Sequence, residues 1–350
     1  MNAAMQGDVL EFGRDTSARQ LLKPLQRWLD EDGVTEICVN RPGEVFIEKA
    51  SRWERFDVPD LTMDALESLT TALAAMDSKE LNDRDPMLST VMPGRERIQA
   101  VCYPACEQGT LSMTIRRPSF GRRTLNEYDS QGFFAHIRPV SEGLTQVESD
   151  MKALLDAGDY MGFLRSAVQH EKVIVVAGAT GSGKTTFMKA LMQEIPTHQR
   201  IITIEDTPEL FLPDHPNHVH LFYPSEATEE ENNSVTAAKC LKSCMRMKPD
   251  RILLAELRGG ETYDFVNVCA SGHGGSITSL HAGSCEMAFE RMALMILQNR
   301  QGRTLPYDVI RRLLYLVVDV VIHVHNEVTL PDVGRHITGI WFDPMKKRQG

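Results

Sequence analysis

The sequence predicts an α/β protein whose carboxy-terminal domain is built on a mostly parallel sheet and is preceded by an α+β domain. A length of 350 residues indicates more than one domain, at roughly 100–200 residues each. After residue 149, short apolar segments alternate with amphipathic ones, as in parallel strands buried between helices. Before residue 118, helical periods accompany alternating strands. We therefore expect an amino-terminal domain over 1–118, a linker or arm over 119–148 and the α/β domain over 149–350.

Hydrophobic periodicity defines the elements of the first domain. Apolar residues recur at helical spacing over 18–32 and 62–76, which predicts two amphipathic helices. Other segments alternate polar and apolar residues, which predicts antiparallel strands. The last of these segments ends where the charges and turn residues of the linker begin. The expected strands span 34–39, 44–49, 88–92, 97–103 and 111–116.

In the second domain, helical and strand periods alternate along the chain. The expected helices span 146–157, 160–170, 184–194, 235–247, 260–270, 286–298 and 306–316. The expected strands span 172–177, 201–205, 251–257, 276–280, 320–324 and 336–342. Short apolar strands between helices are typical of a doubly wound parallel sheet, in which the carboxyl ends of the strands share one edge.

Composition excludes several classes of protein. Hydrophobic residues make up 42% and charged residues 25%, which is ordinary for a globular chain and excludes intrinsic disorder. The net charge of −10 argues against a tight direct contact with nucleic acid. No apolar leader follows Met1, and the longest apolar run, 313–322, is far shorter than the ~20 residues of a membrane span. These features predict a cytoplasmic protein.

The seven cysteines are an odd number spread thinly along the chain, so they do not form a disulfide framework. Two pairs have the same spacing, and in the second pair Cys240 and Cys244 fall one helical turn apart on an apolar face. That setting favours buried thiols over zinc ligands, which need closely matched pairs held by tight turns.

The segment that indicates chemistry lies between a predicted strand and a predicted helix. It has the G-x4-G-K-T pattern of a phosphate-binding loop. Its glycines let successive backbone N–H groups face a phosphate, and the helix N-terminus adds the positive end of its dipole. Lys184 should reach the β- and γ-phosphates of ATP, and the Thr185 hydroxyl should bind Mg²⁺. The expected nucleotide-binding residues are Gly178, Ala179, Thr180, Gly181, Ser182, Gly183, Lys184, Thr185 and Thr186.

Two further apolar strands run into carboxylates. The strand over 201–205 leads into Glu205, Asp206 and Glu209, and the strand over 251–257 carries Glu256. Acids at the carboxyl edge of a parallel sheet lie where ligands bind, and hydrolysis needs acids there to hold Mg²⁺ and to orient water. Solvated loop acids are the alternative for either strand alone.

Two histidines lie at the ends of another predicted strand. His273 precedes residues 276–280 and His281 follows them, with glycines nearby. A role in sensing the γ-phosphate and a role as packed or solvated side chains are equally supported by this spacing.

These segments together, in this order, resemble the secretion ATPases that serve type II secretion, type IV pili and type IV secretion. The residues that carry the resemblance are the phosphate loop, Ile204-Glu205-Asp206, the strand Leu253 to Arg258 and the His273/His281 pair. The branch most similar in sequence is the traffic ATPase of bacterial type IV secretion and conjugation systems, through the segments Thr203 to Leu210, Met247 to Arg251 and Ser271 to Ser276. The resemblance extends from about Leu21 to Val324.

The resemblance implies a RecA-like P-loop domain in a homo-hexameric ATPase that hydrolyses ATP with Mg²⁺. It further implies that turnover powers assembly of, or substrate transfer through, a type IV secretion machine that handles conjugation or protein transport. The partners implied are other ATPases and inner-membrane channel components of that machine, so the protein would be cytoplasmic and peripheral at the inner membrane.

The resemblance also implies roles for particular side chains. Glu256 would polarise the attacking water. Glu205 and Glu209 would support the water network and Mg²⁺, with Glu205 as a metal ligand beside Thr185. The two histidines would couple the γ-phosphate to domain motion. Two arginines of the amino-terminal domain, Arg97 and Arg116, would complete the catalytic site.

Several alternatives stay open at this point. Arg258 would serve as a further arginine of the site or would pair with Glu261. The carboxylate that contacts Mg²⁺ directly, the exchange of the 119–148 arm between neighbours and the exported substrate are not decided by the sequence. Basic residues at 116–123 and 346–348 would allow peripheral contact with an anionic membrane. A nucleic-acid motor, a nucleotide-dependent scaffold and a small-molecule kinase are the rival functions.

Overall fold

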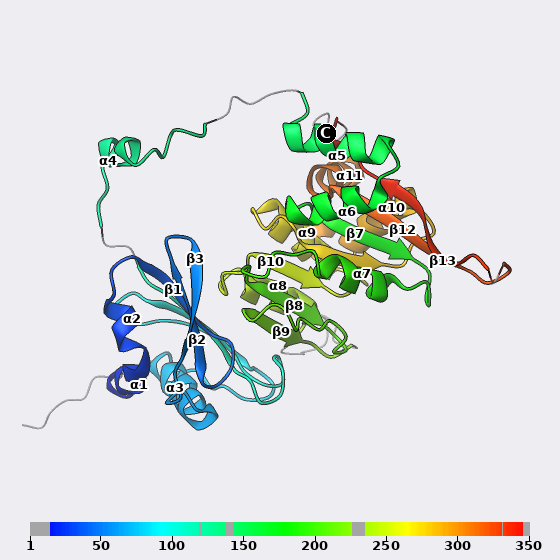
Figure 1. The fold of residues 1–350 in the computed structure, drawn as a ribbon. Helices are drawn as coiled ribbons and strands as arrows, with labels where there is room; N and C mark the ends of the chain where they lie inside the picture. Colours follow the sequence, from blue (N-terminus) through cyan, green and yellow to red (C-terminus); the bar gives the residue numbers. More distant parts are fainter. Residues whose placement is uncertain (1–14, 119–120, 138–142, 226–234, 331, 346–350) are drawn as a thin grey trace, which may run out of the picture. The chain divides into compact units, whose positions relative to one another are not determined.

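A computed structural model describes residues 15–118, 121–137, 143–225, 235–330 and 332–345 (Figure 1). The chain divides into two compact units, Met1–Pro118 and Ser119–Gly350. Both units contain helices and strands, and the second unit has a mostly parallel sheet, which confirms the predicted α/β class. No helix within these described ranges is long and apolar enough to cross a membrane. The basic residues at 346–348 lie outside the described residues.

The first unit contains an antiparallel six-stranded sheet, and its helices and strands share one apolar core. Its order is β3-β2-β1-β6-β5-β4. Leu25, Trp28, Leu66 and Leu73 from the helices share that core with Ile37 and other strand residues. The strands are β1 Val34–Val39, β2 Glu44–Lys49, β3 Arg52–Asp57, β4 Met87–Val91, β5 Arg97–Val101 and β6 Ser112–Arg116. The α-helices are α1 Thr16–Leu21, α2 Gln26–Asp30 and α3 Met63–Met76.

Two features of this unit differ from the prediction. The helix expected over 18–32 is broken by a 3-10 turn at Lys23–Leu25, because Pro24 has no amide hydrogen for a continuous α-helix. Strand β3 was not predicted, since its exposed charges mask the alternation. It follows β2 through a two-residue turn in which Ala50 and Ser51 adopt positive φ values of 50° and 60°, and these residues are not the Asn-Gly signal of such turns.

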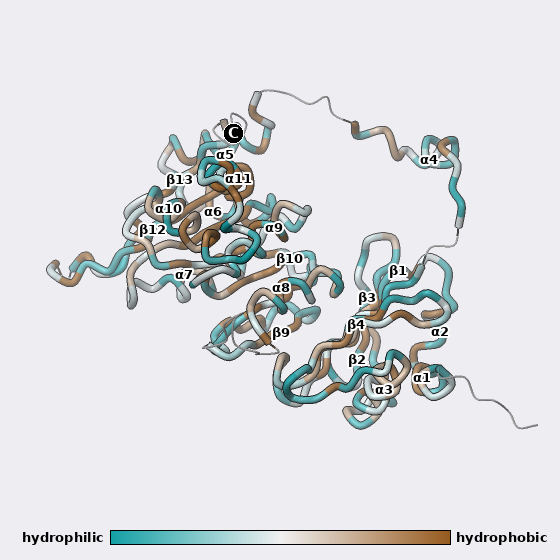
Figure 2. The backbone as a smooth tube through the Cα atoms, turned by 180° about the vertical axis from the view of Figure 1, so that it is seen from behind, coloured by the Kyte–Doolittle hydropathy of each residue, from teal (hydrophilic) through white to brown (hydrophobic). Residues whose placement is uncertain are grey.

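The second unit contains a seven-stranded sheet of order β13-β12-β7-β11-β10-β8-β9, parallel except for the β12–β13 pair. In Figure 2 the hydrophobic segments of this unit gather around the strands and the helices packed on them. The strands are β7 Ile174–Gly178, β8 Ile201–Glu205, β9 His218–Phe222, β10 Arg251–Leu254, β11 Ile277–Leu280, β12 Val320–Glu327 and β13 Gly334–Trp341. The helices are α4 Leu125–Ser130, α5 Gln146–Asp156, α6 Tyr160–Gln169, α7 Lys184–Met192, α8 Ala237–Cys244, α9 Glu261–Ala270, α10 Cys285–Ile296 and α11 Tyr307–Val317.

The order of the strands determines which loops meet. Strand β7 pairs with β11, and β11 pairs with β10, all in parallel. The loops that follow these three strands therefore lie together at the carboxyl edge of the sheet. Helices α5, α6 and α7 contact one another in sequence, as do α8, α9, α10 and α11, so the sheet is covered by two groups of helices.

The second unit also departs from the prediction in four places. Strand β9 and helix α4 were not predicted: β9 carries two histidines, and α4 is a short helix held by a Thr124/Glu127 capping box. Strand β10 ends at Leu254, which leaves Glu256 on the connection to α9. The last two strands are longer than expected, and they pair antiparallel although a parallel sheet was predicted.

All seven cysteines are free thiols, and six of them are buried. Cys240 and Cys244 lie fully inside the apolar face of α8, as the helical spacing predicts. Burial raises the pKa of the Cys106 and Cys240 thiols to about 12.

Candidate functional site

The loop between β7 and α7 is shaped by three glycines. Gly181 and Gly183 have φ values of +76° and +95°, which residues with a Cβ rarely adopt. A Cβ at position 178 would lie 2.4 Å from the carbonyl oxygen of Val324 and 2.6 Å from the Ser182 hydroxyl oxygen. The nine predicted nucleotide-binding residues are consecutive: the last residue of β7, the loop 179–183 and the first three residues of α7.

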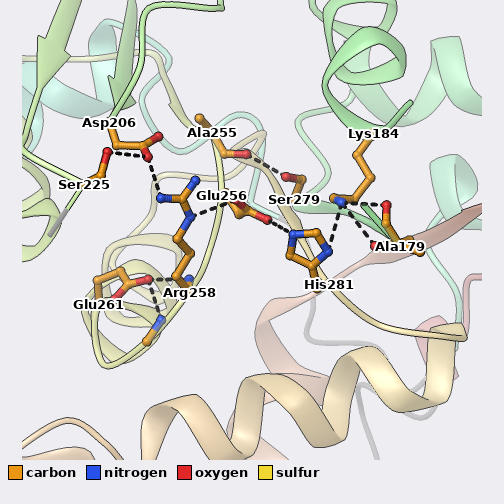
Figure 3. A network of polar contacts seen from close by, with 12 residues as sticks. Ala179, Lys184, Asp206, Ser225, Ala255, Glu256, Arg258, Glu261, Ser279 and His281 are labelled. Carbon is orange, nitrogen blue, oxygen red and sulfur yellow. Dashed lines mark hydrogen bonds and ion pairs between the residues drawn. The ribbon is translucent and has the colours of Figure 1, made fainter. Parts of the chain in front are cut away.

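Lys184 begins α7 and turns its ammonium group onto the loop. Its Nζ donates to the carbonyl oxygens of Gly178 and Ala179, both at 3.1 Å, and lies 3.4 Å from Nδ1 of His281 (Figure 3). Because an ammonium group only donates, Nδ1 of His281 accepts and its proton is on Nε2. Burial lowers the pKa of Lys184, and the charge of Glu256 opposes that effect.

His281 connects the loop lysine to Glu256. Its Nε2 lies 2.8 Å from Oε1 of Glu256. The two residues meet because His281 follows β11 and Glu256 follows the neighbouring strand β10. Ser279 fixes this junction: its hydroxyl donates to the carbonyl of Ala255 at 2.7 Å, and its carbonyl accepts from the amide of Leu257 at 2.8 Å.

Arg258 extends the same network to the strand beyond. Its Nε donates to Oε2 of Glu256 at 2.9 Å, and its Nη1 donates to Oδ2 of Asp206 (Figure 3). Although burial alone would lower it, the hydrogen bonds to these two carboxylates raise the pKa of Arg258. Glu261 does not pair with the Arg258 guanidinium; its carboxylate accepts the backbone amides of Arg258 and Gly259 at 2.6 and 2.8 Å.

The other acids of the 205–209 segment have a different setting. Glu205 is buried, and its Oε2 accepts the amides of Glu209 and Leu210, both at 2.8 Å. Its Oε1 accepts the Thr203 hydroxyl at 2.7 Å and lies 3.5 Å from Nδ1 of His220. These contacts tie down the loop after β8, and a direct contact of Glu205 with a metal would have to replace some of them. Glu209 is exposed, so a metal-supporting role for either acid stays a prediction.

His273 is separated from the network by the length of β11. It precedes the first residue of that strand, whereas His281 follows the last, so His273 lies at the amino edge of the parallel sheet. Its carbonyl accepts the Ser276 hydroxyl at 3.0 Å. Burial lowers the pKa of His273, and the charge of Lys248, in the loop between α8 and β10, lowers it further. The two histidines that the sequence paired therefore face different surroundings.

Arg97 and Arg116 are neighbours in the first unit. They are Cα partners across β5 and β6, and both are exposed. Nε of Arg116 lies 3.6 Å from Oε1 of the buried Glu36, which is its partner on β1. The structure thus brings the two predicted arginines together, while their contact with nucleotide stays a prediction.

The loop in the second unit fits a phosphate chain. The Ser182 hydroxyl is buried and has no hydrogen-bond partner among the described residues. Nothing lies within 4 Å of the place where a Cβ of Gly181 would stand. The ammonium of Lys184 is bound to two neutral carbonyl oxygens of the loop, which a phosphate oxygen would replace as a stronger acceptor.

Two members of the site were not assigned by sequence reasoning. Asp206 was noted next to Glu205 without a role of its own, and Ser279 was not singled out. Asp206 joins the site only because β8 lies beside β10 in the sheet. Its sole local signal is its place one residue after a buried strand.

Comparisons with known proteins identify the family of this chain. Residues 19–323 match the family described as Type II/IV secretion system protein. The chain is 67% identical to the type IV secretion system protein VirB11 of Brucella abortus, over 96% of this chain and 92% of the relative. It is 43% identical to the type IV secretion system protein PtlH of Bordetella pertussis, over 94% of this chain and 96% of the relative.

A solved structure is similar over nearly the whole chain. The crystal structure of the VirB11 ATPase from the Brucella suis type IV secretion system, in complex with sulphate, aligns with a TM-score of 0.90 and 65% identity. The alignment covers 95% of this chain and 99% of that one. By these matches the chain belongs to the type II/IV secretion system protein family, among the VirB11 ATPases of type IV secretion systems.

Proposed function

We propose that this protein hydrolyses ATP as a homo-hexameric ring and that turnover powers assembly of, or substrate transfer through, a type IV secretion machine. The observation that carries the proposal is the continuous polar network from Lys184 through His281, Glu256 and Arg258 to Asp206. It connects a phosphate-binding loop to a carboxylate at the carboxyl edge of the same sheet, which is what phosphoryl transfer to water requires.

Each residue of the network has a defined task in this proposal. The loop amides and Lys184 hold the phosphates of ATP. Glu256 accepts a hydrogen bond from the attacking water and orients it, and His281 holds Glu256 in place through Nε2. The hydroxyl of Thr185, in the first turn of α7, would hold Mg²⁺, which neutralises phosphate charge when it is bound. Arg97 and Arg116 would be the further catalytic arginines, as the resemblance to the secretion ATPases implies.

The setting of the protein follows from its relatives. Those relatives are named as type IV secretion system proteins, so we infer that this chain works with other ATPases and inner-membrane channel components of such a system, at the cytoplasmic face of the inner membrane. In this proposal, ATP binding and hydrolysis move each subunit between empty and nucleotide-bound states. That cycle is what would let the ring act as a motor.

The test combines ATP turnover with the mass of the assembly. The wild-type protein should be a slow ATPase with a mass of six subunits. Lys184→Ala should lose nucleotide binding, whereas Glu256→Gln should bind ATP and fail to cleave it. A wild-type monomer that binds ATP without turnover would favour a scaffold or a kinase and would overturn the proposal.

A further inference from the structure

The β12–β13 hairpin lies beside the phosphate loop. Strand β12 runs beside β7, and Val324 is the Cα partner of Gly178. The hairpin returns so that Arg335 of β13 is the partner of Asn326, two residues beyond Val324. This register brings β13 back toward the loop from the side of β7 opposite to β11 and β10.

Arg335 lies directly against the loop. A Cβ placed on Gly183 would be 3.1 Å from Cδ of Arg335 and 3.6 Å from its Nε. Gly183 is the residue before α7, where backbone N–H groups point out of the helix. The start of the guanidinium therefore stands next to the part of the loop that is built to hold an anion.

Arg335 differs from Lys184 and Arg258 in the partners of its side chain. Lys184 is bound to carbonyls and His281, and Arg258 is paired with two carboxylates. Arg335 is exposed and, within the described ranges of the second unit, has no carboxylate or hydrogen-bond acceptor of its own. A cation without a counterion beside a phosphate loop is available to an incoming phosphate.

The side from which Arg335 approaches indicates the phosphates that it would meet. Lys184 and Glu256 lie toward β11 and β10, where the γ-phosphate would be cleaved. Loop amides such as that of Gly183 cradle the α- and β-phosphates. We propose that Arg335 is a nucleotide-binding residue that contacts the α/β-phosphates, which ADP and ATP share. This inference rests on the proposed ATPase function and adds a residue of β13 to its site.

The test measures ADP binding by calorimetry and ATP turnover as a function of ATP concentration. Arg335→Ala should raise the Kd for ADP and the KM for ATP by about tenfold, because one charge-assisted contact is lost. The kcat should stay within about twofold, because the contact is the same before and during cleavage. The loss should shrink as salt is raised. Arg335→Lys should recover part of the affinity.

Arg312→Ala is the matched control, since Arg312 is also an exposed arginine of this unit and lies in the middle of α11; it should leave Kd and kcat unchanged. Unchanged ADP affinity in Arg335→Ala, with wild-type turnover intact, would overturn this inference and leave the proposed function standing. A fall in kcat at saturating ATP without a change in ADP affinity would also overturn it. A wild-type protein that binds neither nucleotide would overturn the proposed function itself.

Discussion

The two edges of the sheet in the second unit carry the same kind of charge in opposite settings. At the amino edge, Arg200 and Arg251 are both 0% exposed. Nε of Arg200 donates to the carbonyl of Met247 at 2.9 Å. Arg251 donates to the Gln199 side chain at 2.8 Å and to the carbonyl of Val168 at 2.9 Å. These hydrogen-bond acceptors are neutral, and the carboxylate of Glu171 lies farther away, 3.8 Å from Nη2 of Arg251. The two arginines therefore connect loops to the sheet.

At the carboxyl edge, the cations are held by groups that can release them. The Arg258 side chain is 48% exposed and bridges two carboxylates, and Lys184 shares its protons with loop carbonyls and a histidine. A phosphate chain can compete for such cations, whereas it has no access to a buried arginine bound to backbone. The comparison teaches that burial and the kind of acceptor, more than the charge itself, separate a structural cation from a functional one.

The largest expected effect is a loss of stability from a substitution at the amino edge of the sheet. In Gly275→Ala the new Cβ would lie 1.5 Å from a terminal nitrogen of Arg251, at a φ of +72°. We expect a loss of about 4 kcal/mol or more in the free energy of unfolding, measured by urea denaturation. Gly283→Ala is the control, because nothing lies within 4 Å of its Cβ position. Equal midpoints for the two variants would contradict a rigid amino edge.

The next effect separates binding from stability at the other edge. Lys184→Ala should weaken ATP binding by about a hundredfold, because it removes the ammonium group that the phosphate loop holds at the start of α7. The melting temperature should change little, since the freed loop carbonyls can be hydrated. Lys189→Ala, on the same helix, is the control and should bind ATP as the wild type does. Unfolding of Lys184→Ala alone would show that this lysine is structural after all.

A smaller effect tests the bridge between the carboxylates. Arg258→Ala leaves Glu256 and Asp206 without their shared partner, so Glu256 should lose its orientation. We expect kcat to fall about tenfold and the affinity for ADP to stay the same. Arg258→Lys should recover less than half of the loss, because an ammonium does not bridge two acceptors with a planar fork. A drop in ADP affinity with normal kcat would instead assign Arg258 to binding.

The smallest effect compares the two histidines. Burial lowers the pKa of His273 in the folded protein, so the fold favours the neutral ring. This contribution to stability is complete above the ordinary pKa of about 6.5 and is lost as the pH falls toward the lower folded value. His273→Asn should therefore flatten the decline of the unfolding midpoint between about pH 7 and pH 5 and should leave turnover unchanged.

The matched variant is His281→Asn at the carboxyl edge. It should lower turnover, because Glu256 loses its partner. Loss of turnover in His273→Asn would contradict the view that only the carboxyl edge of the sheet takes part in catalysis.

Sequence reasoning succeeded where the signal is local. The phosphate loop occupies nine consecutive residues between one strand and one helix, so its pattern alone identified it. The strand ends at Glu205 and the acid at Glu256 were found in the same way. Which acid faces which cation depends on the order β7-β11-β10-β8, and no local pattern contains that order.

Other differences also have physical causes. The sequence placed His273 and His281 at the two ends of one strand, as the structure has them, but it does not show that only His281 meets the loop lysine and Glu256. Backbone amides four and five residues ahead donate to the Glu205 carboxylate, a contact that the strand pattern does not contain, and the metal role of Glu205 stays a prediction. Strand β3 lacked the usual turn residues, and Pro24 broke a helix whose apolar period continued through it.

The buried thiols have a practical consequence for watching this protein move. All seven are free and six are buried, and the remaining one, Cys102, has a pKa raised by burial to about 11. Maleimide dyes react with accessible thiolates. Six of these thiols are buried, and the raised pKa of Cys102 keeps it protonated near neutral pH. A single cysteine engineered on an exposed position of either unit could therefore carry a fluorophore without removal of the native seven, and pairs of such dyes would report distances during turnover.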